Sequence, residues 1–296
     1  MSVSRMFFLR RRRDRWLPGG PSRGKRLPEL SELTLVPLVG ERRAEAFHKE
    51  GITSIRQLAG IDSTDVRFRT HSCLVGALPL IKNYARAIVE DKPLVTGKHP
   101  FFEDVSSKNV WFFDAEYDPQ GTRSGPYGIF LIGLMDANGN VEQMFLEEAA
   151  NERDMLQSFN EWLLKHRSIL VSYGSVSADR PHLLNAFRRF GLPTDLLGKS
   201  FFDLYYECLN TQRERHQAIF LPMRGSMSIK KVSTHLGYRE PSLAITDGLH
   251  ALVQYDAFLK TKNPSTRENL LQYNRSDLER CAFVFREVCR IFERGC

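Results

Sequence analysis

The sequence lacks the features that mark membrane-spanning, secreted and zinc-binding proteins. No apolar run approaches the ~18 residues of a membrane-spanning helix, and the stretch "MFFL" (Met6–Leu9) is too short for the core of a signal peptide. The five cysteines include no C-x-x-C pair. An odd number of scattered cysteines argues for reduced, intracellular thiols and against a structural zinc site. We therefore expect a cytoplasmic protein that makes no membrane contact.

Acidic residues are almost absent from the start of the chain. Residues 1–26 carry nine basic side chains and one acid, a formal charge of +8, whereas all 296 residues together carry +7. The remaining 270 residues therefore sum to −1, and the basic character belongs to a tail, residues 1–28. Such a tail can attract phosphate without sequence preference. The alternatives are an arm without a dedicated role and an organelle transit peptide.

The chain after the tail begins with a helical region. Residues 29–92 contain short helical patterns, one of them preceded by Ser54 as a candidate N-cap. Two prolines and a glycine predict that residues 93–108 form a linker.

Residues 109–296 alternate strand and helix patterns in the order β-ββ-α-β-α-β-ααα. Asn138-Gly139 between two apolar runs predicts a hairpin, and Glu152–His166 reads as an amphipathic helix. This order predicts an α/β domain with a mixed five-stranded sheet flanked by helices. The first three strands would form an antiparallel meander, and the later strands would join in parallel through helical crossovers.

Two acids follow a buried strand without a break. Val110–Phe113 are bulky β-formers, and the chain continues into Asp114-Ala115-Glu116. Positions i and i+2 of a strand point to the same face, so both carboxylates aim at one spot. Two like charges at that separation raise each other's pKa unless a cation lies between them. The alternative is that Asp114 is only a charge at the strand end.

Further carboxylates are placed to reach the same spot. Asp179 follows the apolar strand "SILVSY", and ligands bind at the C-terminal ends of strands in open α/β sheets. Asp277 lies on the last long helix, with Tyr273 one turn earlier on the same face. The alternatives are that Asp179 caps its helix, a role compatible with metal binding, and that Tyr273 is an ordinary aromatic residue.

Four converging carboxylates predict a site for hard cations. Carboxylate ligand sets favour Mg²⁺ or Mn²⁺ over zinc, and their mutual repulsion requires compensating charge. Two such ions can activate a water and stabilise the departing oxygen of a phosphodiester. The Tyr273 hydroxyl, protonated at neutral pH, would orient the water or the phosphate.

These residues resemble a known group of nucleases. Asp114-x-Glu116, Asp179 after a strand, and Tyr273-x-x-x-Asp277 are similar to the tyrosine subtype of the DEDD (DnaQ-like) 3′→5′ exonucleases, which have a ribonuclease H-like fold. The phrases "YGIFLIGL", "SYGSVSADRPHL", "FFDLYY", "SIKKVSTHLGY" and "LLQYNRSDLERC" resemble the YprB-type group. The resemblance implies a two-metal exonuclease that acts on single-stranded DNA or RNA, with the four acids as metal ligands and Tyr273 beside the nucleophile.

Other functions stay open beside this one. The second motif departs from the family pattern at Tyr173-Gly174-Ser175, which affects substrate positioning more than metal binding. A non-catalytic nucleic-acid-binding protein on a degenerate scaffold is the alternative, and an endonuclease using the same metal site is a third possibility. The complete set of acids favours the enzyme.

The helical region resembles a helix-hairpin-helix unit, whose turn meets a nucleic-acid phosphate through backbone N–H groups. Its turn reads Pro37–Gly40, with Leu38 where the unit has a glycine, and leucine disfavours a positive φ. The unit is therefore either a packing element or a phosphate site formed by Gly40, Arg42 and Arg43.

Four more residues have a simple expected role. Asp203 would hold a strand–helix junction, and Asp247 would cap the helix that follows it. Lys230 and Lys231 either contact the phosphate backbone or belong to a solvated helix face.

Overall fold

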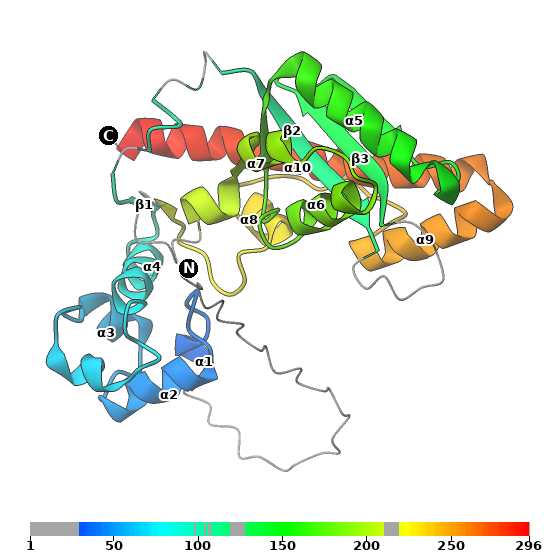
Figure 1. The fold of residues 1–296 in the computed structure, drawn as a ribbon. Helices are drawn as coiled ribbons and strands as arrows, with labels where there is room; N and C mark the ends of the chain where they lie inside the picture. Colours follow the sequence, from blue (N-terminus) through cyan, green and yellow to red (C-terminus); the bar gives the residue numbers. More distant parts are fainter. Residues whose placement is uncertain are drawn as a thin grey trace, which may run out of the picture.

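A computed structural model of the protein describes residues 30–97, 99–103, 105, 108–118, 128–209 and 219–295. Figure 1 shows a small group of helices at the blue end of the chain beside a larger body built around a sheet. The predicted basic tail, residues 1–28, lies outside the described residues. Among the described helices, none is both long enough and apolar enough to cross a membrane.

The larger body contains a five-stranded sheet with the order β4-β3-β2-β5-β6. Its strands are β2 (Val110–Tyr117), β3 (Ile129–Asp136), β4 (Val141–Phe145), β5 (Ile169–Ser172) and β6 (Phe201–Asp203). Strands β2, β3 and β4 pair antiparallel, whereas β5 pairs in parallel with both β2 and β6. The predicted mixed sheet, its antiparallel meander and its parallel later strands are confirmed.

The hairpin between β3 and β4 forms where Asn138-Gly139 predicts it. Gly139 has a φ of +88°, which glycine adopts without strain. The Asp136 carboxylate also accepts hydrogen bonds from the backbone N–H groups of Asn138 (2.8 Å) and Asn140 (2.9 Å). The Asp136 side chain therefore stabilises the turn by binding its backbone N–H groups.

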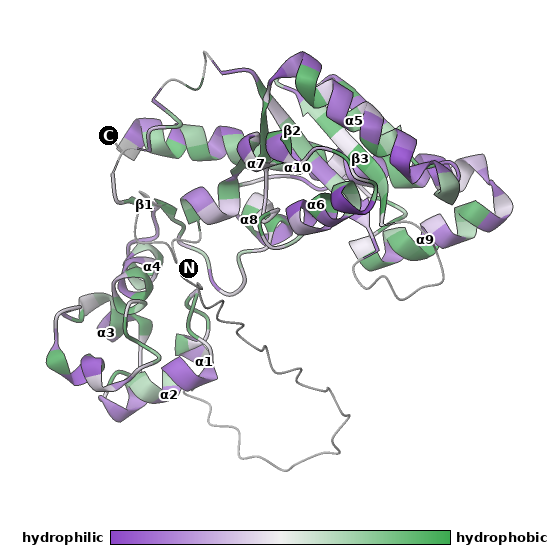
Figure 2. Ribbon diagram, in the orientation of Figure 1, coloured by the Kyte–Doolittle hydropathy of each residue, from purple (hydrophilic) through white to green (hydrophobic). Residues whose placement is uncertain are grey.

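Helices cover both faces of the sheet. Helices α5, α6 and α7 contribute to one hydrophobic cluster, and α8 and much of α10 contribute to a second cluster on the opposite face, whereas α9 packs against α10 and β2. In Figure 2, hydrophilic and hydrophobic residues alternate around α5, as expected for a helix with one buried side. The bounds are η3 (Ala149–Asn151), α5 (Glu152–His166), α6 (Asp179–Arg189), α7 (Asp195–Lys199), the π-helical turn η4 (Tyr205–Leu209), α8 (Ile229–His235), α9 (Gly248–Thr261) and α10 (Pro264–Gly295).

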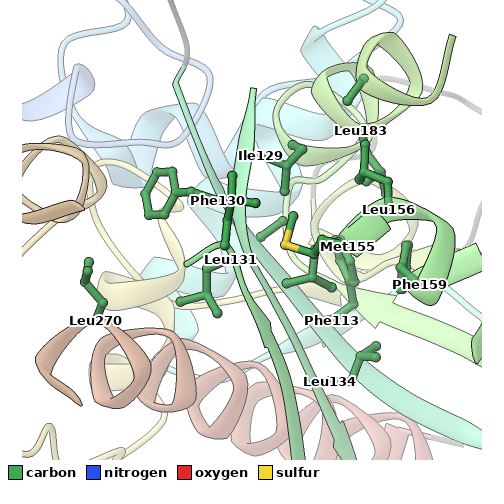
Figure 3. Close-up of a cluster of buried hydrophobic side chains, with 14 of the residues drawn as sticks. Phe113, Ile129, Phe130, Leu131, Leu134, Met155, Leu156, Phe159, Leu183 and Leu270 are labelled. Atoms are coloured by element: carbon green, nitrogen blue, oxygen red, sulfur yellow. The ribbon is translucent and has the colours of Figure 1, made fainter. Parts of the chain in front are cut away.

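Strand β2 divides its side chains between these two clusters. Phe113 and Ala115 belong to the first cluster, part of which is drawn in Figure 3, whereas Phe112 belongs to the second, with α10. Alternate residues of a strand share a face. Asp114 and Glu116 therefore project from β2 on the side of α10.

The helical region before the sheet has its own hydrophobic cluster. Ser54 caps α3 as predicted: its hydroxyl accepts from the Gln57 N–H at 3.2 Å, and its own N–H donates to the Gln57 side chain at 3.1 Å. The helices are α1 (Leu30–Leu33), α2 (Glu41–Lys49), α3 (Ile55–Gly60), η1 (Val66–Thr70) and α4 (Leu78–Glu90).

The turn before α2 corrects one expectation. Leucine disfavours a positive φ, yet Leu38 has a φ of +70°. The Arg43 guanidinium donates to the Leu38 carbonyl at 2.5 Å and to the Cys73 carbonyl at 2.8 Å, and the Leu38 side chain packs against the cluster of this region. These contacts hold a conformation that costs a non-glycine residue about 1–2 kcal/mol.

The helical region is attached to the larger body by strand pairing, hydrogen bonds and ring stacking. Strand β1 (Leu94–Val95) pairs antiparallel with β7 (Ile219–Phe220), so residues from the expected linker form part of a second, small sheet. The Tyr84 hydroxyl donates to the Leu209 carbonyl, and the Gly225 N–H donates to the Leu35 carbonyl at 2.6 Å. Phe101, also in the 93–108 segment, stacks on Phe202 of β6 with ring centroids 3.8 Å apart.

A glycine lets α10 approach the sheet beside the first acid. Gly133 of β3 is the register partner of Asp114, and a Cβ atom at Gly133 would lie 2.0 Å from the Asn274 Oδ1 atom. Asn274 is fully buried on α10 and donates to the Asp114 Oδ2 atom at 2.8 Å. The missing side chain on β3 thus makes room for the amide that holds Asp114.

We predict that Gly133→Ala lowers the free energy of unfolding by about 1–3 kcal/mol, because the added methyl group overpacks a buried contact. Denaturant unfolding measures the change. Gly198→Ala on α7 is the matched control, since a Cβ atom there meets nothing within 4 Å, and it should be neutral or stabilising. Equal stabilities for the two variants would contradict this account.

Candidate active site

Three acids from two elements meet on the α10 side of the sheet. Asp114 and Glu116 come from β2, and Asp277 comes from α10. One carboxylate oxygen from each lies within 4.8 Å of the other two. The predicted same-face placement of Asp114 and Glu116 accounts for two of these oxygens, and the packing of α10 on the sheet supplies the third.

Asp179 lines the same pocket as these three acids, together with Tyr273. It is the first residue of α6, directly after the end of β5 and its loop, and Ala178 occupies the N-cap position. The structure shows no side-chain cap at this helix, so capping does not account for the carboxylate. Asp179 lies outside the trio whose oxygens are mutually within 4.8 Å, and it forms another wall of the pocket.

Asp203 fixes the loop that leads to Asp179. Its carboxylate accepts from the backbone N–H groups of Gly174 (2.8 Å) and Val176 (2.9 Å) in that loop. It also accepts from the N–H groups of Tyr205 (3.0 Å) and Tyr206 (3.2 Å) in its own segment. Asp203 is 2% exposed, and its expected structural role at a strand–helix junction is what the structure shows.

Burial and mutual repulsion raise the pKa values of the pocket acids. Burial is the largest cause for each, and the neighbouring carboxylates add to it for Asp114, Glu116 and Asp179. The pKa of Asp179 rises to about 7, and those of Asp114 and Glu116 rise well above their usual values. Burial also raises the pKa of Asp277, and the positive charge of Arg280 opposes this rise. A buried set of this kind favours either protons or cations.

Tyr273 stands at the same pocket with a protonated hydroxyl. It is 6% exposed, and its hydroxyl is hydrogen-bonded to Asp277. Burial, followed by the nearby acids, raises its pKa above the usual value. It therefore keeps its proton at neutral pH and can donate a hydrogen bond into the pocket.

Lys230 lies near this pocket on α8. Its ammonium group donates to the Thr246 carbonyl, and it stands 5.9 Å from the centre of the Tyr273 ring. Its charge opposes the rise that burial causes in the pKa values of Glu116 and Asp277. The structure thus places this predicted phosphate contact beside the acids, whereas its neighbour Lys231 is exposed.

The other predicted phosphate contacts lie on the turn of the helical region. Gly40 is the exposed N-cap residue of α2, and Arg42 is exposed on that helix. Arg43 directs its guanidinium to two carbonyl groups of its own region. The hydrogen bonds of Arg43 thus stabilise the turn itself. Of the three predicted phosphate contacts in this region, Gly40 and Arg42 are exposed.

Three polar residues at the site were not predicted. Asn274 holds Asp114, and the Gln143 side chain holds Asn274 by donating to its Oδ1 atom at 2.9 Å. Arg280 donates to Asp277. Asn274 and Arg280 are polar residues on the buried stripe of a long helix, which is a signal that the periodicity of α10 offers.

Asp247 caps α9 as predicted. Its carboxylate accepts from the His250 N–H at 2.9 Å. The cap places Gly248 and Leu249 at the wall of the acidic pocket. A Cβ atom at Gly248 would lie 3.8 Å from the Glu116 Oε2 atom, so the helix begins close to the acids.

The raised pKa values predict how stability depends on pH without metal. Carboxyls with a higher pKa folded than unfolded bind more protons in the folded state between about pH 4 and pH 7, so stability falls as pH rises through this range. We expect the free energy of unfolding in EDTA to fall less between pH 5 and pH 8 for Asp114→Asn than for the wild type, by on the order of 1 kcal/mol.

Denaturant unfolding at a series of pH values measures this difference, and added Mg²⁺ should restore the wild type at pH 8. The comparison between the two proteins removes the contribution of His182 and His235, whose lowered pKa values act in the opposite direction. Parallel pH profiles for the two proteins would show that repulsion among the carboxylates does not affect the free energy of unfolding.

Comparison with known proteins finds a similar solved structure and a matching family model. The solved structure of the family B DNA polymerase from the hyperthermophilic archaeon Pyrobaculum calidifontis is similar to the chain, with 18% identity and a TM-score of 0.44. The similarity covers 61% of this chain and 24% of the polymerase. No curated protein matches the sequence. Residues 111–289, more than half of the chain, match the model of the ribonuclease H superfamily, and the chain therefore belongs to this superfamily.

Proposed function

We propose that the protein is a metal-dependent 3′→5′ exonuclease acting on single-stranded DNA or RNA. Within the superfamily we assign it to the DEDD group, tyrosine subtype, with a YprB-type domain over residues 109–296. The observation that carries the proposal is the single pocket lined by Asp114, Glu116, Asp179, Asp277 and Tyr273.

The donor set fits the proposed cofactor. The ligands are oxygens of buried or partly buried acids, and three of them lie within 4.8 Å of one another. Carboxylate oxygens suit Mg²⁺ or Mn²⁺. Bound cations would replace the protons that these acids otherwise retain because of their raised pKa values. Two such ions held by these acids would supply an activated water and stabilisation of the leaving oxygen.

The residues that line or neighbour the pocket would have different roles in the reaction. Asp114, Glu116, Asp179 and Asp277 would hold the ions from three elements of the fold, β2, α6 and α10. Tyr273, which keeps its proton, orients the water or the scissile phosphate by a hydrogen bond. Lys230 adds a positive charge near Glu116 that favours an incoming phosphate.

The helical region, residues 29–92, is the proposed second contact with nucleic acid. Gly40 and Arg42 are exposed at the start of α2, where backbone N–H groups suit a phosphate. Such a contact carries no base preference. The basic tail would add a further, salt-sensitive attraction.

A non-catalytic binding protein is the main alternative. It predicts a decayed acidic site, yet all four acids and the tyrosine line one pocket, and Asn274 and Arg280 hold two of the acids by hydrogen bonds. An endonuclease would use the same residues. An exonuclease needs a free end of the substrate and an endonuclease does not, so a substrate without free ends distinguishes the two activities.

The decisive experiment is a ladder of 5′-labelled single-stranded DNA and RNA oligonucleotides with Mg²⁺ or Mn²⁺. We expect the wild type to shorten the oligonucleotide one nucleotide at a time, and Asp114→Ala to lose at least about a hundredfold in rate, because a metal ligand is removed. Asp62→Ala, an exposed acid of the helical region, is the control. Equal rates for wild type and Asp114→Ala, or no cleavage by either, would refute catalysis at this site.

We predict that Tyr273→Phe turns over about ten- to a hundredfold more slowly while metal binding is retained, since the variant loses a hydrogen bond to the reacting group and no metal ligand. Single-turnover kinetics and Mn²⁺ titration measure the two effects separately. Loss of Mn²⁺ binding in Tyr273→Phe would contradict the assigned role.

A further inference from the structure

Arg280 is the largest fully buried side chain in the part of the chain that the structure describes. It is 1% exposed and lies on α10, three residues after Asp277. Its guanidinium donates to the Asp277 Oδ1 atom and, at 2.5 Å, to the Glu240 Oε1 atom. A buried guanidinium is stabilised only by such partners, and loss of one leaves the charge uncompensated. Arg280 thus connects Asp277, which lines the pocket, to Glu240, which lies outside it.

Glu240 belongs to the connection between α8 and α9, residues 236–247. Its side chain is 42% exposed, and it is absent from the residues that line the acidic pocket. Further along the same connection, the Thr246 carbonyl accepts from Lys230, whose ammonium group lies 5.9 Å from the centre of the Tyr273 ring. The connection is therefore linked to pocket residues at two points, through Arg280 and through Lys230.

We propose that Glu240 and Arg280 are positioning residues that hold the Asp277 carboxylate in the geometry that binds metal. The proposal rests on the proposed function of the pocket. Arg280 donates to the Oδ1 atom of Asp277 and so fixes the direction in which this carboxylate faces the other acids. Without this bond, repulsion from Asp114 and Glu116 would drive Asp277 away when the acids are ionised and no cation is bound.

The guanidinium geometry is needed, and its charge alone does not suffice. A planar guanidinium presents donors in fixed directions, so one side chain reaches Asp277 and Glu240 together. A lysine in its place keeps the charge but not this geometry. The variant Arg280→Lys therefore separates positioning from simple neutralisation of the acids.

The same helix offers a matched control. Arg275 pairs with Glu279 at 2.9 Å, but both side chains are exposed, at 56% and 40%. Exposed pairs contribute little to stability. The variants Arg275→Lys and Glu279→Gln repeat the two substitutions without touching the pocket.

The test is Mn²⁺ binding to the full chain without substrate, measured by calorimetry and by the loss of the free Mn²⁺ EPR signal. We expect Glu240→Gln and Arg280→Lys each to weaken binding by about tenfold, as outer partners of metal ligands do. The two control variants should stay within about twofold of the wild type. Circular dichroism verifies folding, and the exposure of Glu240 makes Glu240→Gln the safer variant should Arg280→Lys fail to fold.

Activity provides a second measurement. In Glu240→Gln the Mn²⁺ concentration for half-maximal cleavage should rise about tenfold, while the rate at saturating Mn²⁺ stays near that of the wild type. A loss of folded protein would lower the rate at every Mn²⁺ concentration instead.

The outcomes separate this inference from the proposed function. Wild-type Mn²⁺ affinity in Glu240→Gln would overturn the positioning role, as would wild-type affinity in Arg280→Lys. A wild-type protein that binds no Mn²⁺ would overturn the proposed metal site itself.

Discussion

Repulsion among carboxylates that share one pocket is the constraint on which this structure depends. Asp114, Glu116 and Asp277 bring oxygens within 4.8 Å of one another, and burial raises the pKa of each. Like charges in a site of low dielectric favour separation unless protons or cations intervene. The fold must therefore hold these acids against their own repulsion, and a site under this tension is suited to bind divalent cations.

Different polar groups hold different parts of the pocket, two of them on α10 and one on β6. Asn274 binds Asp114 in the space left by Gly133, and Arg280 binds Asp277. Asp203 organises the loop that ends at α6 and thereby places the remaining acid. Each is a buried polar group with partners, so it contributes to stability and also fixes the geometry of the pocket. Support for the site and folding of the domain are thus the same set of interactions.

Local sequence patterns predicted most of the fold. The apolar run at β2, the Asn138-Gly139 turn and the cap at Ser54 all appear where expected, because each depends on residues close together in the chain. The short pair β1 and β7 was not predicted, since two-residue strands leave no periodic pattern. Leu38 shows the same limit: its positive φ is held by Arg43 and by packing, and propensity alone argues against it.

The sequence by itself determined which acids share a strand face and which residue types the site would contain, since the period of two in β2 and the spacing of Tyr273 and Asp277 on α10 are properties of the local backbone. Only the tertiary structure decided which side chains hold them. Glu240 and Arg280 are 40 residues apart in the chain, and Gln143 and Asn274 are 131 apart. Contacts at such separations arise when packing brings elements together, and no local pattern encodes their partners.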